Sequence, residues 1–140
     1  MKKYLILIAL VILGVICVGA VSAADVTVDG LTFHMIDGFV EESADSANGI
    51  PMRQALNVYA KGDEKIYIKT MASSAENFDI DQETFDGAFE DLDVEPKTIN
   101  GHKGYYNETE DGEYAFSYLK DARIVTITVP DEAYLEKIII

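Results

Sequence analysis

The segment EYAFSYLKDARIVTITV, residues 113–129, decides the fold, because it contains two alternating stretches separated by a short turn. Alternation with a period of two is typical of a strand that buries one face. A turn of two or of four residues within 120–123 gives the same register, so a hairpin with one core face is expected. Pairs of an aromatic and a β-branched residue stabilise a sheet by about 0.2–1 kcal/mol each. The predicted pairs are Tyr114 with Val129, Phe116 with Ile127 and Tyr118 with Val125.

Asp-Gly and Asn-Gly dipeptides mark two further tight turns. Such dipeptides between strand-like segments are the strongest short-range hairpin signal, because both residues accept the positive φ angles of a two-residue turn. Around Asp29-Gly30 the turn pairs Val28 with Leu31 and leaves His34 pointing outward. Around Asn100-Gly101 it predicts another hairpin.

The segment Met52–Met71 predicts two strands joined by a turn within residues 61–64. A loop of three or five residues would put the aliphatic side chains of both strands in the core, so we expect an odd-length loop. The outer face then carries tyrosine, amide and basic side chains. Tyrosine combines a large contact area with a hydroxyl at low entropic cost, which suits a binding surface. The predicted ligand-binding residues are Asn57, Tyr59, Tyr67, Lys69 and His34.

Two other interpretations of this tyrosine-bearing face stay open. Tyrosine is a good strand former on any half-exposed sheet, whether or not a ligand binds there. Alternatively, the C-terminal helix could cover the face, and the tyrosines would then be buried.

The stretch Ser73–Val94 predicts the one long helix. Asp79 followed by Gln82 fits a capping box at its start. The opposite side is acidic, with nine carboxylates and no Lys or Arg between Glu76 and Glu95. The predicted buried side consists of Ile80, Phe85, Ala88, Phe89 and Leu92.

Within this acidic stretch, Asp79, Asp81 and Glu83 have a spacing similar to the start of a calcium loop. Thr84 stands where such a loop requires glycine, so we expect a solvated acidic face rather than a metal site.

These elements predict an α+β fold with an antiparallel sheet of six or seven strands. The long helix packs on one face, and residues 133–140 form a short C-terminal helix. Residues 41–51 are acidic, rich in small residues and contain Asn48-Gly49 and Pro51, which predicts a surface loop.

The first 23 residues predict an export signal rather than part of the domain. Lys2 and Lys3 precede an apolar run, and the small residues before Ala24 fit cleavage after Ala23. The run is also long enough for an uncleaved membrane anchor, which is the alternative. In both cases residues 24–140 are expected to form a single domain that is secreted or held at the cell surface.

Composition limits the partners and the chemistry of this domain. Residues 24–140 carry nine basic and 25 acidic side chains and no cysteine. The resulting charge of −16 argues against nucleic acid and anionic lipid as partners. His34 and His102 are far apart, and no zinc, phosphate-loop or serine-nucleophile motif is present. We therefore expect no cofactor and no membrane contact outside the N-terminal segment.

A binding domain for an extracellular protein or glycan is the predicted function. An acidic cation-binding or enzyme-accessory protein and a small hydrolase are the alternatives. Asn107-Glu108-Thr109 is an N-glycosylation triplet, meaningful only in an exported chain.

The segment Phe33–Phe39 and the segment from Gly104-Tyr105-Tyr106 through Pro130-Asp131-Glu132 resemble small exported proteins of methanogenic archaea, a group without an established activity. The layout of strands and helices also resembles, at the level of fold, the Mog1/PsbP-like α+β domains. Their opening hairpin often ends in a Pro-x-Gly-Phe or Pro-x-Gly-Trp turn, where this chain has Ile36 in place of proline. The resemblance implies an exported α+β domain and supplies no catalytic residues.

Overall fold

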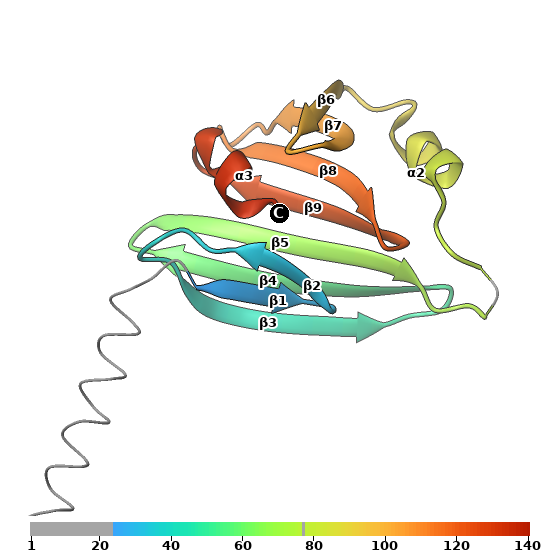
Figure 1. Ribbon diagram of the computed structural model, residues 1–140, viewed down its shortest axis with the longest axis horizontal. Coiled ribbons are helices and arrows are strands. Elements are labelled where there is room, and N and C mark those ends of the chain that lie inside the picture. Colours follow the sequence, from blue (N-terminus) through green and yellow to red (C-terminus); the bar gives the residue numbers. More distant parts are fainter. Residues whose placement is uncertain (1–23, 77) are drawn as a thin grey trace, which may run out of the picture.

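The computed structural model describes residues 24–76 and 78–140, and antiparallel sheet dominates this part of the chain (Figure 1). In these two ranges, a two-stranded hairpin stands apart from a seven-stranded sheet, and two short helices accompany them. The hairpin consists of β1 (Asp25–Val28) and β2 (Leu31–His34). The sheet consists of β3 (Val40–Asn48), β4 (Met52–Lys61), β5 (Glu64–Ser73), β6 (Glu95–Ile99), β7 (His102–Glu108), β8 (Tyr114–Lys120) and β9 (Arg123–Val129). The helices are α2 (Gln82–Phe89) and α3 (Ala133–Ile138).

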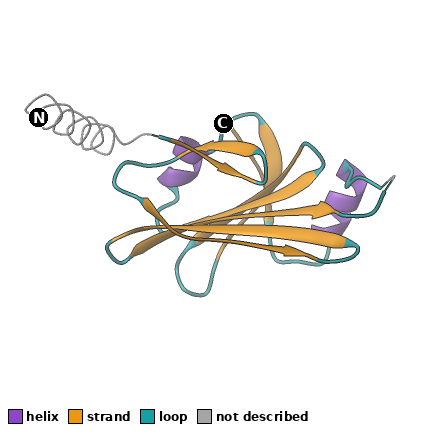
Figure 2. Cartoon of the chain, turned by 90° about the horizontal axis from the view of Figure 1, so that it is seen from below, coloured by secondary structure: helices purple, strands orange, loops and turns teal. Residues whose placement is uncertain are grey.

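The strand order β3-β4-β5-β9-β8-β7-β6 joins two meanders through the central pair of β5 and β9. The first meander runs from the β3 edge inward, and the segment that contains α2 then carries the chain to the opposite edge. From β6 the second meander returns to the centre. Figure 2 shows the two helices at opposite ends of the molecule.

The register predicted for residues 113–129 is confirmed. Phe116 lies opposite Ile127 and Tyr118 opposite Val125, and all four side chains are at most 1% exposed. The turn has two residues, Asp121 and Ala122, with φ angles of 50° and 59°. The hairpin predicted around Asn100 and Gly101 is confirmed as well, because Ile99 pairs with His102.

One face of the sheet, here called the covered face, is closed by the β1–β2 hairpin and by α3 (Figure 1). Val28, Leu31 and Phe33 of the hairpin pack there against Ile66, Ile68 and the β8–β9 core, and Leu135 and Ile138 of α3 complete the layer. Burial of this apolar surface is the main stabilising contribution to the fold.

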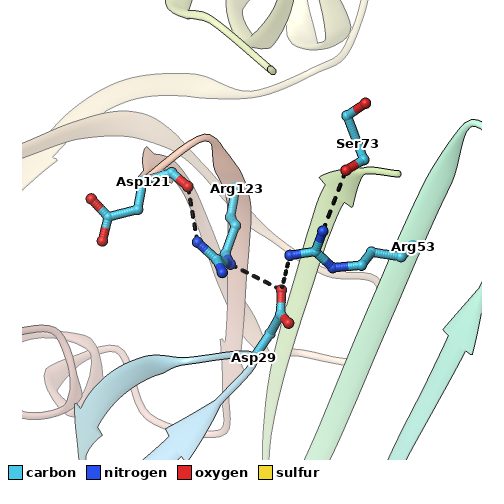
Figure 3. A network of polar contacts seen from close by, with 5 residues as sticks. All are labelled: Asp29, Arg53, Ser73, Asp121 and Arg123. Atoms are coloured by element: carbon cyan, nitrogen blue, oxygen red, sulfur yellow. Dashed lines mark hydrogen bonds and ion pairs between the residues drawn. The ribbon is translucent and has the colours of Figure 1, made fainter. Parts of the chain in front are cut away.

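A polar network fixes the tip of the β1–β2 hairpin to the sheet (Figure 3). The Asp29 carboxylate accepts a hydrogen bond from Arg53 Nη2 at 3.3 Å and another from Arg123 Nε at 2.9 Å, both on Oδ2. The two guanidinium groups also donate to the backbone oxygens of Ser73 and Asp121. The only two arginines of the sequence thus converge on one turn residue, which joins β1 and β2 to β4 and β9.

The surface loop predicted over residues 41–51 is wrong, because β3 occupies most of this segment. Among the described residues, β3 pairs only with β4, and it forms the edge of the sheet. Every side chain of β3 is exposed except Ser43, which is half-buried. The strand therefore lacks the alternation of apolar and polar residues from which a sequence predicts a strand. Its three carboxylates suit an edge strand, where charge discourages pairing with other chains.

The long helix predicted over Ser73–Val94 is also wrong. β5 extends to Ser73, and α2 has only eight residues. Its N-cap is Asp81, whose side chain accepts a hydrogen bond from the Thr84 amide at 2.8 Å. Ile80 is buried ahead of the helix, and Leu92 is 56% exposed beyond it. Repulsion between like charges one turn apart disfavours a longer helix through this acidic stretch.

Candidate functional site

The turn between β4 and β5 decides which side chains the sheet presents on each face. Lys61 pairs with Glu64, so the turn has two residues, Gly62 and Asp63. The predicted loop of three or five residues is wrong, because Gly62 adopts the left-handed conformation (φ 60°) that a tight turn requires. The consequence is that Tyr59 lies opposite Ile66, on the covered face.

The five predicted ligand-binding residues therefore do not form one surface. Tyr59 and Asn57 are buried on the covered face, 1% and 7% exposed, with Asn57 Nδ2 donating to Tyr59 Oη at 3.1 Å. Burial raises the pKa of the Tyr59 phenol. Tyr67 and Lys69 lie on the opposite face. His34 is exposed on β2, where its Nδ1 is 2.6 Å from Asp25 Oδ1.

The face opposite the hairpin and α3, here called the open face, is covered by α2 over one end only. On β4, β5 and β9 its side chains are mostly half-buried, and Leu56 is 36% exposed. The side chains of the same strands on the covered face include Ile66, Ile68 and Ile127, all fully buried. The open face consists of Leu56, Val58, Lys65, Tyr67, Lys69, Met71, Ile124, Thr126 and Thr128.

An aromatic cluster attaches α2 to its end of this face. Phe85 is fully buried, and its ring centroid is 5.0 Å from that of Phe89 and 5.5 Å from that of Tyr105. Phe89 and Tyr105 stack at 4.9 Å. Of the two adjacent tyrosines in β7, Tyr105 thus belongs to the α2 side, whereas Tyr106 packs against the core of the covered face.

Three hollows flank α2, one of which is lined by Glu83, Asp86, Gly87, Glu90 and Tyr105. A small one of about 170 Å³ lies between the helix and the open face, where Ala88 and Phe89 meet Met71 and Ile124, and Lys69 also lines it. A larger one of about 720 Å³ lies between α2, β6 and β7. It is lined by Gln82, Phe85, Asp86, Pro96, Lys97, Thr98, Lys103, Gly104 and Tyr105.

Asp86 is held in place at the edge of the larger hollow. Its Oδ1 accepts a hydrogen bond from Tyr105 Oη at 2.8 Å and another from Gln82 Nε2 at 2.9 Å. The bond to Asp86 raises the pKa of the Tyr105 phenol. Residues 86 and 105 are brought together only by the packing of α2 on β7, so sequence spacing gave no signal for this pair.

The predicted glycosylation residue, Asn107, is half-buried within β7 and pairs with Ala115. The predicted cleavage site at Ala23 and the export segment lie outside the described residues. Within residues 24–76 and 78–140, no helix is long and apolar enough to span a membrane. No three His, Cys, Asp or Glu side chains of that same part are grouped as a metal site requires.

Comparison with family models, with curated proteins and with solved structures gave no match for this chain. The resemblances to exported archaeal proteins and to Mog1/PsbP-like domains therefore stay predictions.

Proposed function

We propose that the chain is an exported, non-enzymatic interaction domain that binds a partner protein through the open face. The difference between the two faces of the sheet carries this proposal. One face is sealed by the hairpin and α3, and the other leaves large side chains such as Leu56 and Tyr67 accessible. A contiguous apolar patch rimmed by polar residues is typical of interaction sites.

Charge supports a partner with acidic side chains. The charged residues that β4, β5 and β9 place on the open face are both lysines, Lys65 and Lys69, whereas the edge strand β3 adds Asp45 opposite Leu56. Lys65 forms an ion pair with Glu42 at 3.2 Å. Lys69 lies beside apolar side chains. A partner carboxylate bound there would be shielded from water, which would strengthen its attraction to the Lys69 ammonium.

The small hollow beside α2 offers the anchor point that such a partner needs. Binding energy usually concentrates on a few side chains that fill well-packed pockets. An apolar cavity of about 150 Å³ holds a benzene ring, and this hollow has about 170 Å³ with mostly apolar walls. The partner segment is therefore proposed to place one apolar side chain between Phe89 and Met71, with a neighbouring Asp or Glu at Lys69.

Export is proposed from the N-terminal sequence, in which two lysines precede an apolar run and small residues. Intact mass of the mature chain tests this step. A chain that begins at Ala24 is expected, and a chain that keeps residues 1–23 in the membrane fraction would instead be an anchored protein.

A site-specific cross-link tests the open face itself. A photoreactive phenylalanine derivative is placed at Tyr67 in one variant and at Ile50, which is 95% exposed in a loop, in the control. In cells that make the chain, position 67 is expected to give a defined adduct and position 50 none. In the position-67 variant, Lys69→Glu should abolish the adduct, whereas Lys137→Glu on α3 should not. An adduct that forms equally from both positions, or survives Lys69→Glu, would contradict the proposal.

A further inference from the structure

The hollow between α2, β6 and β7 has the size and composition of a small-molecule site. Its volume of about 720 Å³ is within the range of roughly 300–1,000 Å³ typical of ligand pockets. Such pockets combine apolar walls with a few placed polar groups. Here the exposed Pro96 and the half-buried Tyr105 ring supply apolar surface, and Gln82, Asp86 and Lys103 supply polar groups.

The aromatic wall of this hollow is already in place without a ligand. The Tyr105 ring stacks on Phe89 with an angle of 16° between the planes, and Phe85 contacts both rings. The Tyr105 hydroxyl is fixed at the same time by its hydrogen bond to Asp86. A wall built from ordered rings does not lose further side-chain freedom when a ligand binds.

The Asp86 carboxylate is oriented for a cationic group. The two donors, Tyr105 and Gln82, both bond to Oδ1, which leaves Oδ2 to accept from a ligand. The pair also fixes the side-chain rotamer. Because these two bonds hold the carboxylate in one orientation, a ligand ammonium would meet it in a defined position.

Lys103 brings the opposite charge to the same hollow. The ion pairs found among the described residues involve neither Asp86 nor Lys103, so the two charges line one space without neutralising each other. Both side chains are exposed, so a ligand with a single charge would pair with one of them and leave the other without a partner. A ligand that carries both charges satisfies both.

We infer that this hollow binds a small zwitterion with an apolar side chain, such as an amino acid or a dipeptide. The ligand ammonium lies at Asp86, the carboxylate lies at Lys103, and the apolar side chain packs on Tyr105 and Pro96. This site shares no residue with the list that defines the open face, and it goes beyond the proposed function because it assigns a small ligand to a separate set of residues.

A matched set of probes tests the charge requirement. Calorimetry with the full chain compares L-phenylalanine with phenethylamine, which lacks the carboxylate, and with 3-phenylpropionate, which lacks the ammonium. Phenylalanine is expected to bind about tenfold or more tightly than either relative, since each relative leaves one protein charge unpaired. Absence of saturable phenylalanine binding at millimolar concentration, or equal affinity for all three probes, would overturn the inference.

Variants then assign each charge to its residue. Asp86→Asn should weaken the binding of phenylalanine and phenethylamine but not that of phenylpropionate, and Lys103→Gln should weaken phenylalanine and phenylpropionate but not phenethylamine. Asp91→Asn and Lys120→Gln, which change exposed or half-buried charges outside the hollow, should leave all three affinities unchanged. Circular dichroism confirms that each variant is folded. Equal losses of affinity in the control variants would mean that the overall charge of the protein, and not a defined site, determines binding.

Discussion

Thr70 offers the sharpest test of the packing on the covered face. It lies in β5 between Ala55 of β4 and Val125 of β9, and it is 1% exposed. Its Oγ1 is buried and has no hydrogen-bond partner among the described residues. Burying a hydroxyl without a partner costs about 1–3 kcal/mol by mutational data. Thr70→Val keeps the shape of the side chain and its strand preference while removing that hydroxyl.

The free energy of unfolding of Thr70→Val is therefore expected to rise by about 1–2 kcal/mol. The melting temperature should increase by about 4 °C for each kcal/mol, the shift typical of a domain near this size. Urea unfolding followed by circular dichroism measures the change, with an unchanged m-value as the sign that the unfolded state is unaffected.

The same substitution at Thr126 is the matched control. Thr126 Oγ1 is 2.7 Å from Ser117 Oγ, which belongs to a residue that is only 5% exposed. Thr126→Val leaves the Ser117 hydroxyl unpaired and should lower stability by about 1 kcal/mol. The free energy of unfolding is therefore expected to rise in Thr70→Val and to fall in Thr126→Val. A loss of stability in Thr70→Val would refute the reasoning, because it would mean that the Thr70 hydroxyl has a partner or that β5 packs in another register.

Three further predictions concern the turn, the hairpin tip and a half-buried phenol. Ala122 has a φ of 59°, so Ala122→Gly should raise the free energy of unfolding by about 0.5–1 kcal/mol in thermal unfolding. Asp29→Ala should lower it by about 1–2 kcal/mol and speed amide exchange in β1 and β2, whereas Asp25→Ala, at an exposed pair, should change it little. Burial, and then the Glu132 carboxylate, raises the pKa of Tyr106 from 10.0 to about 12. The stability that this shift contributes is complete below pH 10 and is lost as the pH rises through 12. Ultraviolet titration of the wild type and of Tyr106→Phe measures the pKa of the Tyr106 phenol.

Local turn chemistry explains why much of the sheet could be predicted. Asp29-Gly30 and Asn100-Gly101 fix two-residue turns, and residues 120–123 give one register for either turn length. The β4–β5 connection is different, since a change of one residue in loop length moves every side chain of one strand to the other face of the sheet. There, aliphatic residues on β4 favoured the wrong face, because Leu56 and Val58 point to the open side and the core instead takes Tyr59.

The remaining errors have a common physical cause, which is that long-range packing overrides local patterns. β3 is a strand because β4 offers it an edge to pair with, although its own side chains bury almost nothing. α2 is short although the apolar spacing continues to Leu92. Its contact with the sheet is made by Phe85 together with Phe89 and Tyr105. The pair of Asp86 and Tyr105 depends on the same packing and was out of reach from the sequence.

Nitration of tyrosines, read by peptide mass spectrometry, tests the central claim that one face of the sheet is open and is used. The isolated chain is expected to react at Tyr67 and not at Tyr59, since these residues lie on opposite faces. In intact cells, Tyr67 should be protected by the bound partner. Equal reaction of both tyrosines would contradict the assignment of faces, and equal reactivity of Tyr67 in cells and in isolation would contradict its role in binding.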